Sequence, residues 1–264
     1  VIPYVCAVSD LKPRMLGPCV GYEREGEVVL VGYPLHDPKD KGAMAEAVSL
    51  ALRLPGLRRI TVIGPARPPQ APKSAAIEED WYYSLPVPAS PPGQKTRNLL
   101  RRAGRELTVE RGGAWGEDHA ALVQRYLNER SLAAGIRHIY KRLPRYLAES
   151  SSSLLVSARL ADGRLAALSV GEYASLATAF YMFSFRDPGI APPGATDLLL
   201  AQLLEEASER GHTKMNLGLA VNEGIGFFKR KWGAVPFLPY VQATWEIASP
   251  GISTVLASLF RRRS

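Results

Sequence analysis

The chain has 264 residues and a mass of 28.8 kDa, and 46% of its residues are hydrophobic and 22% charged. This length fits one large domain or two modest ones. The apolar fraction is enough for a sizeable core, which excludes an intrinsically disordered chain. The 23 glycines and 21 prolines follow no repeat and there are only two cysteines, which excludes collagen-like and disulfide-rich proteins. The net charge of +8 predicts an anionic partner without identifying it.

The first part of the chain alternates predicted strands with one helix. Apolar runs predict strands over residues 28–32 and 60–63, and an aromatic run predicts a third over residues 81–83. Between the first two, apolar residues at helical spacing predict a helix over residues 43–54. Gly56 follows this helix and is a typical C-terminal stop.

The second part repeats this order at greater length. Its predicted helices cover residues 118–130, 137–148, 196–210 and 223–231. Its predicted strands cover residues 154–160, 165–171, 177–185, 215–217 and 235–245. The first two of these strands form a predicted hairpin, because the residues between them favour a turn. The helix over residues 196–210 has a strongly apolar face.

The two halves share the same order of elements and of the residues that end them. Each has a strand, an Asp-Pro pair, a long helix, a stopping glycine and a short strand that ends in glycine. These residues are Asp37, Gly56 and Gly64 in the first half, and Asp187, Gly211 and Gly218 in the second. The pattern predicts a degenerate internal duplication into residues 1–92 and 93–264. The predicted fold class is α/β (α+β), with two units of mixed, mostly antiparallel sheet flanked by helices.

The excess positive charge is concentrated in two segments. Residues 95–111 contain six lysines and arginines against two glutamates, and Arg261, Arg262 and Arg263 lie near the C-terminus. The first segment could attract the phosphates of tRNA, of a nucleotide-linked substrate or of an anionic membrane, or it could be a solvated helix face. Apolar residues at helical spacing over 252–260 predict either a helix on an anionic membrane surface or a last helix that covers the sheet.

Other local features predict a cytoplasmic protein without a metal site. Cys6 and Cys19 form no CxxC pair and have no neighbouring histidines, so they are expected to fill apolar space. No run approaches 18 apolar residues, so no membrane span is expected. The first residues lack an initiator Met and a basic segment, which is typical of a trimmed or fragmentary N-terminus rather than a signal peptide.

Three short motifs resemble known acyltransferases. They are GQKTRNLLRRA at residues 93–103, MNLG at residues 215–218 and GFFKRKWGA at residues 226–234. The order of elements over residues 107–245 resembles the GNAT acyltransferase fold, with residues 1–92 as an incomplete first GNAT-like unit. The two halves together resemble the tandem-GNAT proteins of the Fem family and the catalytic domain of aminoacyl-phosphatidylglycerol synthases. The Fem family transfers amino acids from tRNA to peptidoglycan precursors.

The resemblance implies an acyl- or aminoacyltransferase with no permanently bound cofactor. The donor would be acyl-CoA or aminoacyl-tRNA, and the acceptor would be an amine or hydroxyl. The donor would enter between the strands at residues 177–185 and 215–218, which splay apart in this fold. The alternative is a non-catalytic module that binds RNA or anionic lipid through the same basic groove. The acceptor, the transferred group and the oligomeric state cannot be read from the sequence.

The resemblance also places a donor-binding loop before the helix that begins near residue 196. Residues 186–191 match the family's CoA-binding sequence (Gln/Arg)-x-x-Gly-x-(Gly/Ala), although Pro192, Pro193 and Gly194 intervene before the helix. The N–H groups and dipole of that helix would face a pyrophosphate. The candidate donor-binding residues are Arg186, Gly189, Ala191, Gly194, Ala195 and Thr196. The alternative is a Pro/Gly-rich loop that only leads into the helix.

Four residues are candidates for the chemistry, each with an alternative. Lys229 matches the families' lysine and would meet phosphate or a developing oxyanion, or it lies on a solvated helix face. Asn216 would orient the acceptor or cap the next turn. Glu172 would act as a base if it faces the cleft, and Tyr181 would donate a proton or simply pack. The candidate substrate- and anion-binding residues are Lys95, Arg97, Arg101, Arg105, Phe228 and Trp232.

Overall fold

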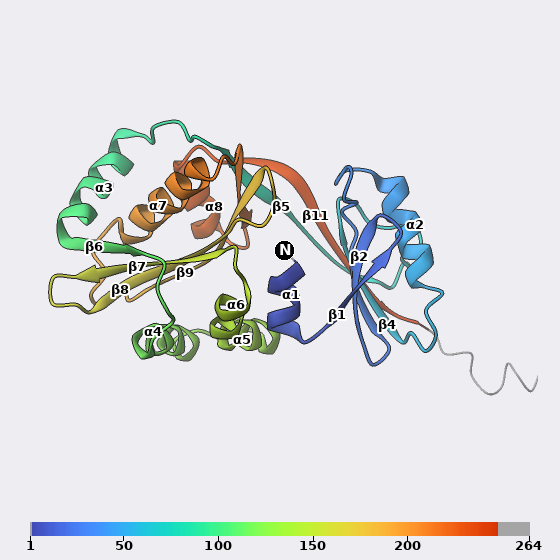
Figure 1. Cartoon of the computed structure of the whole chain (residues 1–264). Coiled ribbons are helices and arrows are strands. Elements are labelled where there is room, and N and C mark those ends of the chain that lie inside the picture. The colour runs from blue at the N-terminus through green and yellow to red at the C-terminus, as the bar shows by residue number, and fades with distance from the viewer. Residues whose placement is uncertain (1, 248–264) are drawn as a thin grey trace, which may run out of the picture. The chain divides into compact units, whose positions relative to one another are not determined.

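The computed structural model describes residues 2–247, which fold into two compact units (Figure 1). Unit 1 contains residues 2–10 and 81–237, and unit 2 contains residues 11–80 and 238–247. The predicted helix over residues 252–260 and the three arginines after it lie outside the described residues. No helix between residues 2 and 247 has both the length and the apolar character needed to cross a membrane.

Unit 2 is a mixed sheet with one covering helix. Its strands, in sheet order, are β1 (Lys12–Leu16), β2 (Cys19–Arg24), β3 (Glu27–Val31), β4 (Arg59–Gly64) and most of β11 (Val235–Glu246). Only β3 and β4 run parallel, because α2 (Lys41–Ala51) carries the chain back between them. Asp40 caps this helix by accepting a hydrogen bond from the Ala43 N–H at 2.9 Å. Four residues of α2 are buried, namely Met44, Ala47, Val48 and Ala51.

The strands of unit 1 also pair in a mixed pattern. Its strands, in sheet order, are β5 (Ala76–Pro86, from residue 81), β10 (Lys214–Leu219), β9 (Thr178–Arg186), β8 (Leu165–Glu172), β7 (Ser153–Leu160) and β6 (Leu107–Arg111). Only β9 and β10 run parallel. All eight residues of β8 are buried, because this strand is covered on both faces and paired on both edges.

Helices cover both faces of the unit 1 sheet (Figure 1). On one face lie α3 (Gln94–Glu106), α7 (Ala195–Glu209) and α8 (Glu223–Lys231). On the other lie α1 (Ile2–Ser9), α4 (Glu117–Asn128), α5 (Ala134–Lys141) and α6 (Leu143–Glu149). The predicted α7 buries its apolar stripe, with Leu199, Leu200 and Leu203 fully inaccessible. This burial accounts for the strong amphipathic pattern of the sequence.

The fold class predicted from sequence is confirmed, and several elements differ in detail. The single helix expected over residues 137–148 is two helices, because Pro144 occupies the first turn of α6 and has no N–H to continue α5. The elements α1, β1, β2 and β6 were not predicted.

Each unit takes one strand from the other half of the sequence. Residues 82–86 of β5 pair with β10 in unit 1, and residues 241–246 of β11 pair with β4 in unit 2. The compact units therefore do not follow a single cut in the chain. The predicted division into residues 1–92 and 93–264 is a different statement, because it says that the two halves of the sequence share one pattern of elements. It stays a prediction.

Candidate active site

The strands β9 and β10 separate after three paired residues. Their parallel register joins Thr178 to Lys214 and ends at Phe180 and Asn216. There β10 bends, because the Asn216 Oδ1 accepts a hydrogen bond from the Gly218 N–H at 2.8 Å. Gly218 has a φ of +76°, which glycine adopts without the steric cost of a Cβ. Asn216 thus closes the turn that opens the sheet, which is the second of its two predicted roles.

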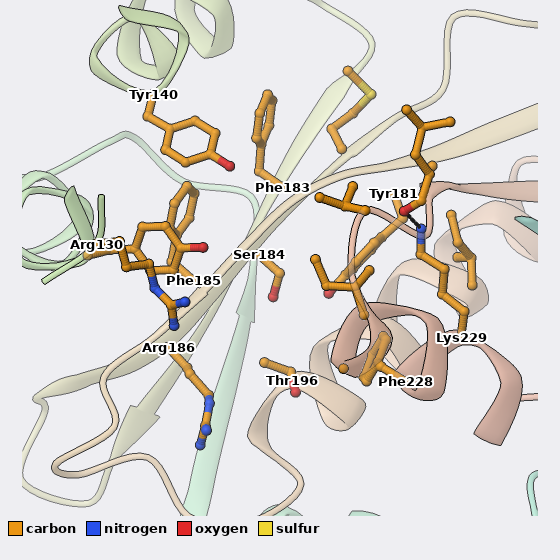
Figure 2. A pocket seen from close by; sticks show the side chains of 18 of the residues that line it. Arg130, Tyr140, Tyr181, Phe183, Ser184, Phe185, Arg186, Thr196, Phe228 and Lys229 are labelled. Atoms are coloured by element: carbon orange, nitrogen blue, oxygen red, sulfur yellow. Dashed lines mark hydrogen bonds between the residues drawn. The ribbon is translucent and has the colours of Figure 1, made fainter. Parts of the chain in front are cut away.

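A cavity of about 440 Å³ opens where the strands part (Figure 2). Its walls come from β9, from the end of β10, from α8 and from the first turn of α7, with residues of α4 and α5 on one side. Three cationic side chains line it, Arg130, Arg186 and Lys229, against the single carboxylate of Glu129 among the described lining residues. The cavity therefore favours an anionic ligand with an apolar body.

Lys229 is a buried cation in the wall of this cavity, with only 3% of its surface exposed. Its Nζ donates a hydrogen bond to the Leu219 carbonyl oxygen and lies 5.9 Å from the centre of the Tyr83 ring. The first contact holds the end of β10 to α8, and the second brings the Lys229 ammonium close to β5. The alternative that Lys229 lies on a solvated helix face is wrong, because α8 turns this residue inward.

The aromatic residues beside Lys229 have different positions. Phe228 lines the cavity, and its ring stacks on Tyr181 with 6.3 Å between centroids and 22° between planes. Trp232 is buried outside the cavity lining, and its Nε1 donates to the Asp197 Oδ1 at 2.7 Å. Lys231 also pairs with this carboxylate at 2.7 Å. Trp232 therefore anchors α8 to the first turn of α7 rather than contacting a ligand.

Tyr181 is held as a neutral phenol in the cavity wall. Burial raises the pKa of its hydroxyl above the usual tyrosine value, and this effect outweighs the hydrogen bonds with Ser184 and Ser169 that lower it. Tyr181 is therefore protonated at neutral pH and packs against Phe228, and its role as a proton donor stays a prediction.

The loop between β9 and α7 contributes only part of the predicted donor site. Arg186, Pro188 and Thr196 line the cavity, and Gly189 and Ala191 of the matched motif do not. Asp187 holds this loop in place, because its carboxylate pairs with Arg125 at 2.7 Å and accepts from the Gly189 N–H at 2.9 Å. The intervening prolines separate the motif from the helix, as the sequence indicated.

Gly194 is required where the loop enters α7. Its φ is +92°, and a Cβ at this position would lie 2.7 Å from the Leu99 carbonyl oxygen of α3. The start of α7 is therefore pressed against α3 at this point. Gly194 and Ala195 do not line the cavity, and their small size lets α7 begin close to α3.

The basic residues of α3 are exposed, and within the described lining none of them reaches the cavity. Arg97 donates to the Pro92 carbonyl oxygen and Arg101 to the Asn98 Oδ1, both at 2.7 Å. Lys95 and Arg105 also lie on the exposed surface. These residues form a separate cationic surface on α3.

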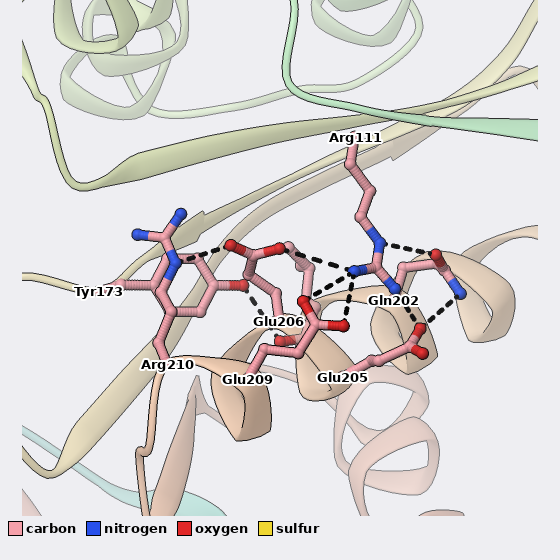
Figure 3. Close-up of polar contacts among 8 residues, drawn as sticks. Arg111, Tyr173, Gln202, Glu205, Glu206, Glu209 and Arg210 are labelled. Carbon is pink, nitrogen blue, oxygen red and sulfur yellow. Dashed lines mark hydrogen bonds and ion pairs between the residues drawn. The ribbon is translucent and has the colours of Figure 1, made fainter.

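Arg111 belongs to β6 rather than to the basic helix, and carboxylates surround it (Figure 3). It forms ion pairs with Glu205, Glu206 and Glu209 of α7, and its Nε donates to the Gln202 Oε1 at 2.9 Å. Its charge is therefore offset within the protein. Of the six cations in residues 95–111, Arg111 is therefore not available to a ligand.

Glu172 does not face the cleft, so its predicted role as a base is not supported. It lies fully buried at the end of β8 and outside the cavity lining. Its carboxylate accepts from three hydroxyls, those of Tyr146, Ser150 and Ser152, and from the backbone N–H groups of residues 173 and 174. Burial alone would raise the pKa of Glu172, but these hydrogen bonds outweigh it and hold the pKa below the usual value.

Four residues that the sequence analysis did not single out complete the site. Tyr126, Glu129 and Arg130 at the end of α4 and Tyr140 in α5 line the cavity opposite α8. The Arg130 guanidinium lies 4.4 Å from the centre of the Tyr126 ring. No local motif marks these residues, because only the packing of α4 and α5 on the sheet brings them to β9.

Comparisons with known proteins agree with this geometry. Residues 94–230, more than half of the chain, match a family model described as an acetyltransferase (GNAT) domain. A comparison with curated proteins found no match.

Similar solved structures include those of both resembling groups. L-PGS from Bacillus licheniformis is 12% identical with a TM-score of 0.61, over 99% of this chain and 92% of that one. The C-terminal domain (DUF2156) of a putative lysylphosphatidylglycerol synthetase from Agrobacterium fabrum is 16% identical with a TM-score of 0.61, over 97% and 89%. FemX is 11% identical with a TM-score of 0.58, over 92% and 86%. At these identities the likeness shows the fold alone, and the family match shows that the chain belongs to the GNAT acetyltransferase family.

Proposed function

We propose that this protein transfers an acyl or aminoacyl group from a phosphate-bearing donor to an amine or hydroxyl acceptor in the cavity between β9 and β10. The observation that carries the proposal is the end of strand pairing at Phe180 and Asn216, with the cavity opening beyond it. There the facing backbone edges no longer pair with each other. A donor with an extended, amide-containing arm can supply the missing partners.

The phosphate end of the donor would lie at the first turn of α7. Arg186 and Thr196 line this end of the cavity, and helix N-termini favour anions. Arg186 forms no ion pair within residues 2–247, so its charge is available to a ligand. Acyl-CoA and aminoacyl-tRNA both satisfy this chemistry. The likeness to the C-terminal domain of a putative lysylphosphatidylglycerol synthetase favours including aminoacyl donors and lipid acceptors in any test.

The reaction would proceed by attack of the acceptor nitrogen or oxygen on the donor carbonyl carbon. The bond from that carbon to the donor sulfur or oxygen then breaks, and the acceptor loses a proton. The Lys229 ammonium, in the wall of the cavity, would stabilise the oxyanion. The neutral Tyr181 would protonate the leaving group. Glu129, the carboxylate among the described lining residues, would receive the acceptor's proton.

A transfer assay with matched lysine variants tests this proposal. Acetyl-CoA and aminoacyl-tRNA are each offered with amine, hydroxyl and lipid acceptors, and product is followed by mass spectrometry. We expect Lys229→Ala to reduce transfer by about 100-fold or more, the scale of losing one oxyanion donor. Lys39→Ala, at an exposed position in unit 2, should leave the rate unchanged. A rate in Lys229→Ala equal to that of the wild type contradicts the assignment.

The exposed cations of α3 favour one second candidate function. Lys95, Arg101 and Arg105 lie on the surface outside the cavity lining, where an RNA or an anionic lipid could bind without any transfer. Binding of RNA with a steep salt dependence, without turnover of any donor, would favour this non-catalytic module. A cytoplasmic location and membrane contact through residues 252–263 stay predictions.

A further inference from the structure

A second recess of about 570 Å³ adjoins the cavity between β9 and β10. The two spaces share the six residues Tyr126, Arg130, Tyr140, Phe183, Val221 and Ile225. The other residues that line the recess are Tyr4, Ser131, Leu132, Ile136, Ile139 and Asn222. The two spaces therefore lie side by side along these residues.

Aromatic rings form the floor of this recess in a fixed arrangement. The Phe183 ring lies 5.8 Å from Tyr4 and 5.9 Å from Tyr140, measured between centroids. Tyr140 and Tyr126 each meet the neighbouring Phe185 edge to face at 5.1 Å. Such contacts hold each ring in one orientation, so the apolar surface exists before a ligand arrives.

The rim of the recess exposes large apolar side chains to water. Val221 is 72% exposed, Ile136 40% and Ile225 39%. Single exposed apolar residues are ordinary, but a group of them around a concave apolar surface is typical of a ligand-binding site. Val221 also has a φ of +57°, an unfavourable backbone conformation for a β-branched residue.

The charge around the recess limits what it can hold. Among the described lining residues there is no Asp, Glu, Lys or His, and Arg130 is the charged group at the boundary with the cavity. Arg130 has no carboxylate partner within residues 2–247. An ammonium group in the recess would meet the like charge of Arg130 and could gain only the faces of aromatic rings, whereas an apolar group with a neutral or anionic end fits.

We propose that this recess binds an apolar part of the substrate, an aromatic ring or an aliphatic chain of about four or more carbons without positive charge. The inference rests on the proposed function, because it places the donor in the adjoining cavity. The apolar group could belong to the acyl moiety of the donor or to the body of the acceptor. Both sources share the same chemistry, and the experiment distinguishes them.

Two aspartate variants isolate the recess from the rest of the cavity. Ile136→Asp introduces a carboxylate at the rim, at a helix position that is 40% exposed. Leu176→Asp makes the same change at a 97% exposed position outside both lining sets, as a matched control. Binding of acetyl-, butyryl- and hexanoyl-CoA and of free 4-phenylbutyrate and hexylamine is then measured by titration calorimetry.

Two results support the proposal and identify the source of the apolar group. If the acyl moiety occupies the recess, affinity rises up to about fourfold per added methylene, and Ile136→Asp abolishes this rise while Leu176→Asp keeps it. If the acceptor occupies it, chain length has no effect, but 4-phenylbutyrate binds and Ile136→Asp weakens that binding at least about tenfold.

Other results separate failure of the recess from failure of the proposed function. If Ile136→Asp leaves the affinity of every probe unchanged, the proposed role of the recess is wrong. It is also wrong if hexylamine binds as tightly as 4-phenylbutyrate. If neither acyl-CoA nor aminoacyl-tRNA binds, while 4-phenylbutyrate binds and depends on Ile136, the proposed transfer fails and the apolar recess stands.

Discussion

The substitution Glu172→Gln separates a structural carboxylate from a catalytic base. A base would lose its proton-accepting role, so turnover would fall by about 100-fold or more while stability stayed the same. A carboxylate that organises the fold would instead lower stability and leave turnover intact at temperatures where the variant is folded. The geometry supports the second outcome, because Glu172 is fully buried and five donors surround it outside the cavity lining.

The size of the stability loss follows from those donors. The amide oxygen of glutamine can still accept the N–H groups of Tyr173 and Ala174, which the carboxylate accepts at 2.9 and 3.0 Å. The amide nitrogen would face hydroxyls that now donate, and these must rotate to accept. Hydrogen bonds to charged groups contribute about 1.5–3 kcal/mol against about 0.5–1.5 for neutral ones, and the lower desolvation cost of an amide offsets part of the difference. We expect a net loss of about 2–4 kcal/mol, or about 4–16 °C in Tm.

The pH dependence provides a second readout of the same residue. The folded-state pKa of Glu172 lies below its usual value, so its carboxylate contributes stability above the unfolded-state pKa of about 4.3. That contribution is lost as the pH falls through the lower folded-state pKa. The difference in Tm between wild type and Glu172→Gln should therefore narrow below about pH 4.

Calorimetric unfolding, transfer rates and the surface variant Glu149→Gln complete the test. Glu149 forms an exposed ion pair with Arg145 at 2.7 Å, so the same substitution there should cost less than about 1 kcal/mol. Unchanged unfolding of Glu172→Gln together with a loss of turnover would refute the structural role.

Three further substitutions test other parts of unit 1. Gly218→Ala forces a Cβ into the left-handed region at φ +76°, so we expect a loss of about 1–2 kcal/mol in denaturant titrations and weaker donor binding. Burial lowers the pKa of His119, whose Nδ1 accepts from the Gly116 N–H at 3.0 Å. The neutral ring is thus favoured in the fold, stability should fall as the pH drops below about 6.5, and His119→Gln should flatten this slope in denaturation at pH 5 and 8. Asp197→Asn leaves Lys231 without its buried partner, so we expect a loss of about 3 kcal/mol in thermal unfolding and a raised KM for the donor.

The elements that the sequence predicted well are those whose signals are local. The helix α8 was predicted with its observed limits, because Asn222 caps its start by accepting from the Ile225 N–H at 3.0 Å and Gly233 follows its end. The opening of the sheet is also local, since Asn216 and Gly218 form the bend between themselves. A short motif can therefore mark the place where a cavity opens in the sheet.

The elements that it missed depend on distant partners. The strand β6 follows α3 without a breaker, and the basic residues continue across the boundary. Only pairing with β7, about 50 residues further along, makes residues 107–111 a strand. The first strand, β1, buries only Leu16 of its five residues, so it shows no alternation that a sequence pattern can detect.

The charge illustrates the same limit and defines the site more closely. A count along residues 95–111 gives a dense positive segment, yet the fold offsets Arg111 with three glutamates that lie more than 90 residues away. In contrast, Arg130 and Arg186 lie in no basic run but line the cavity without a carboxylate partner within residues 2–247. The cations that matter for a ligand are those that have no carboxylate partner and lie at a concave surface. A cation in an ion pair already has its charge offset by a carboxylate of the protein. The anion implied by the net charge is therefore expected first at the parted strands of unit 1.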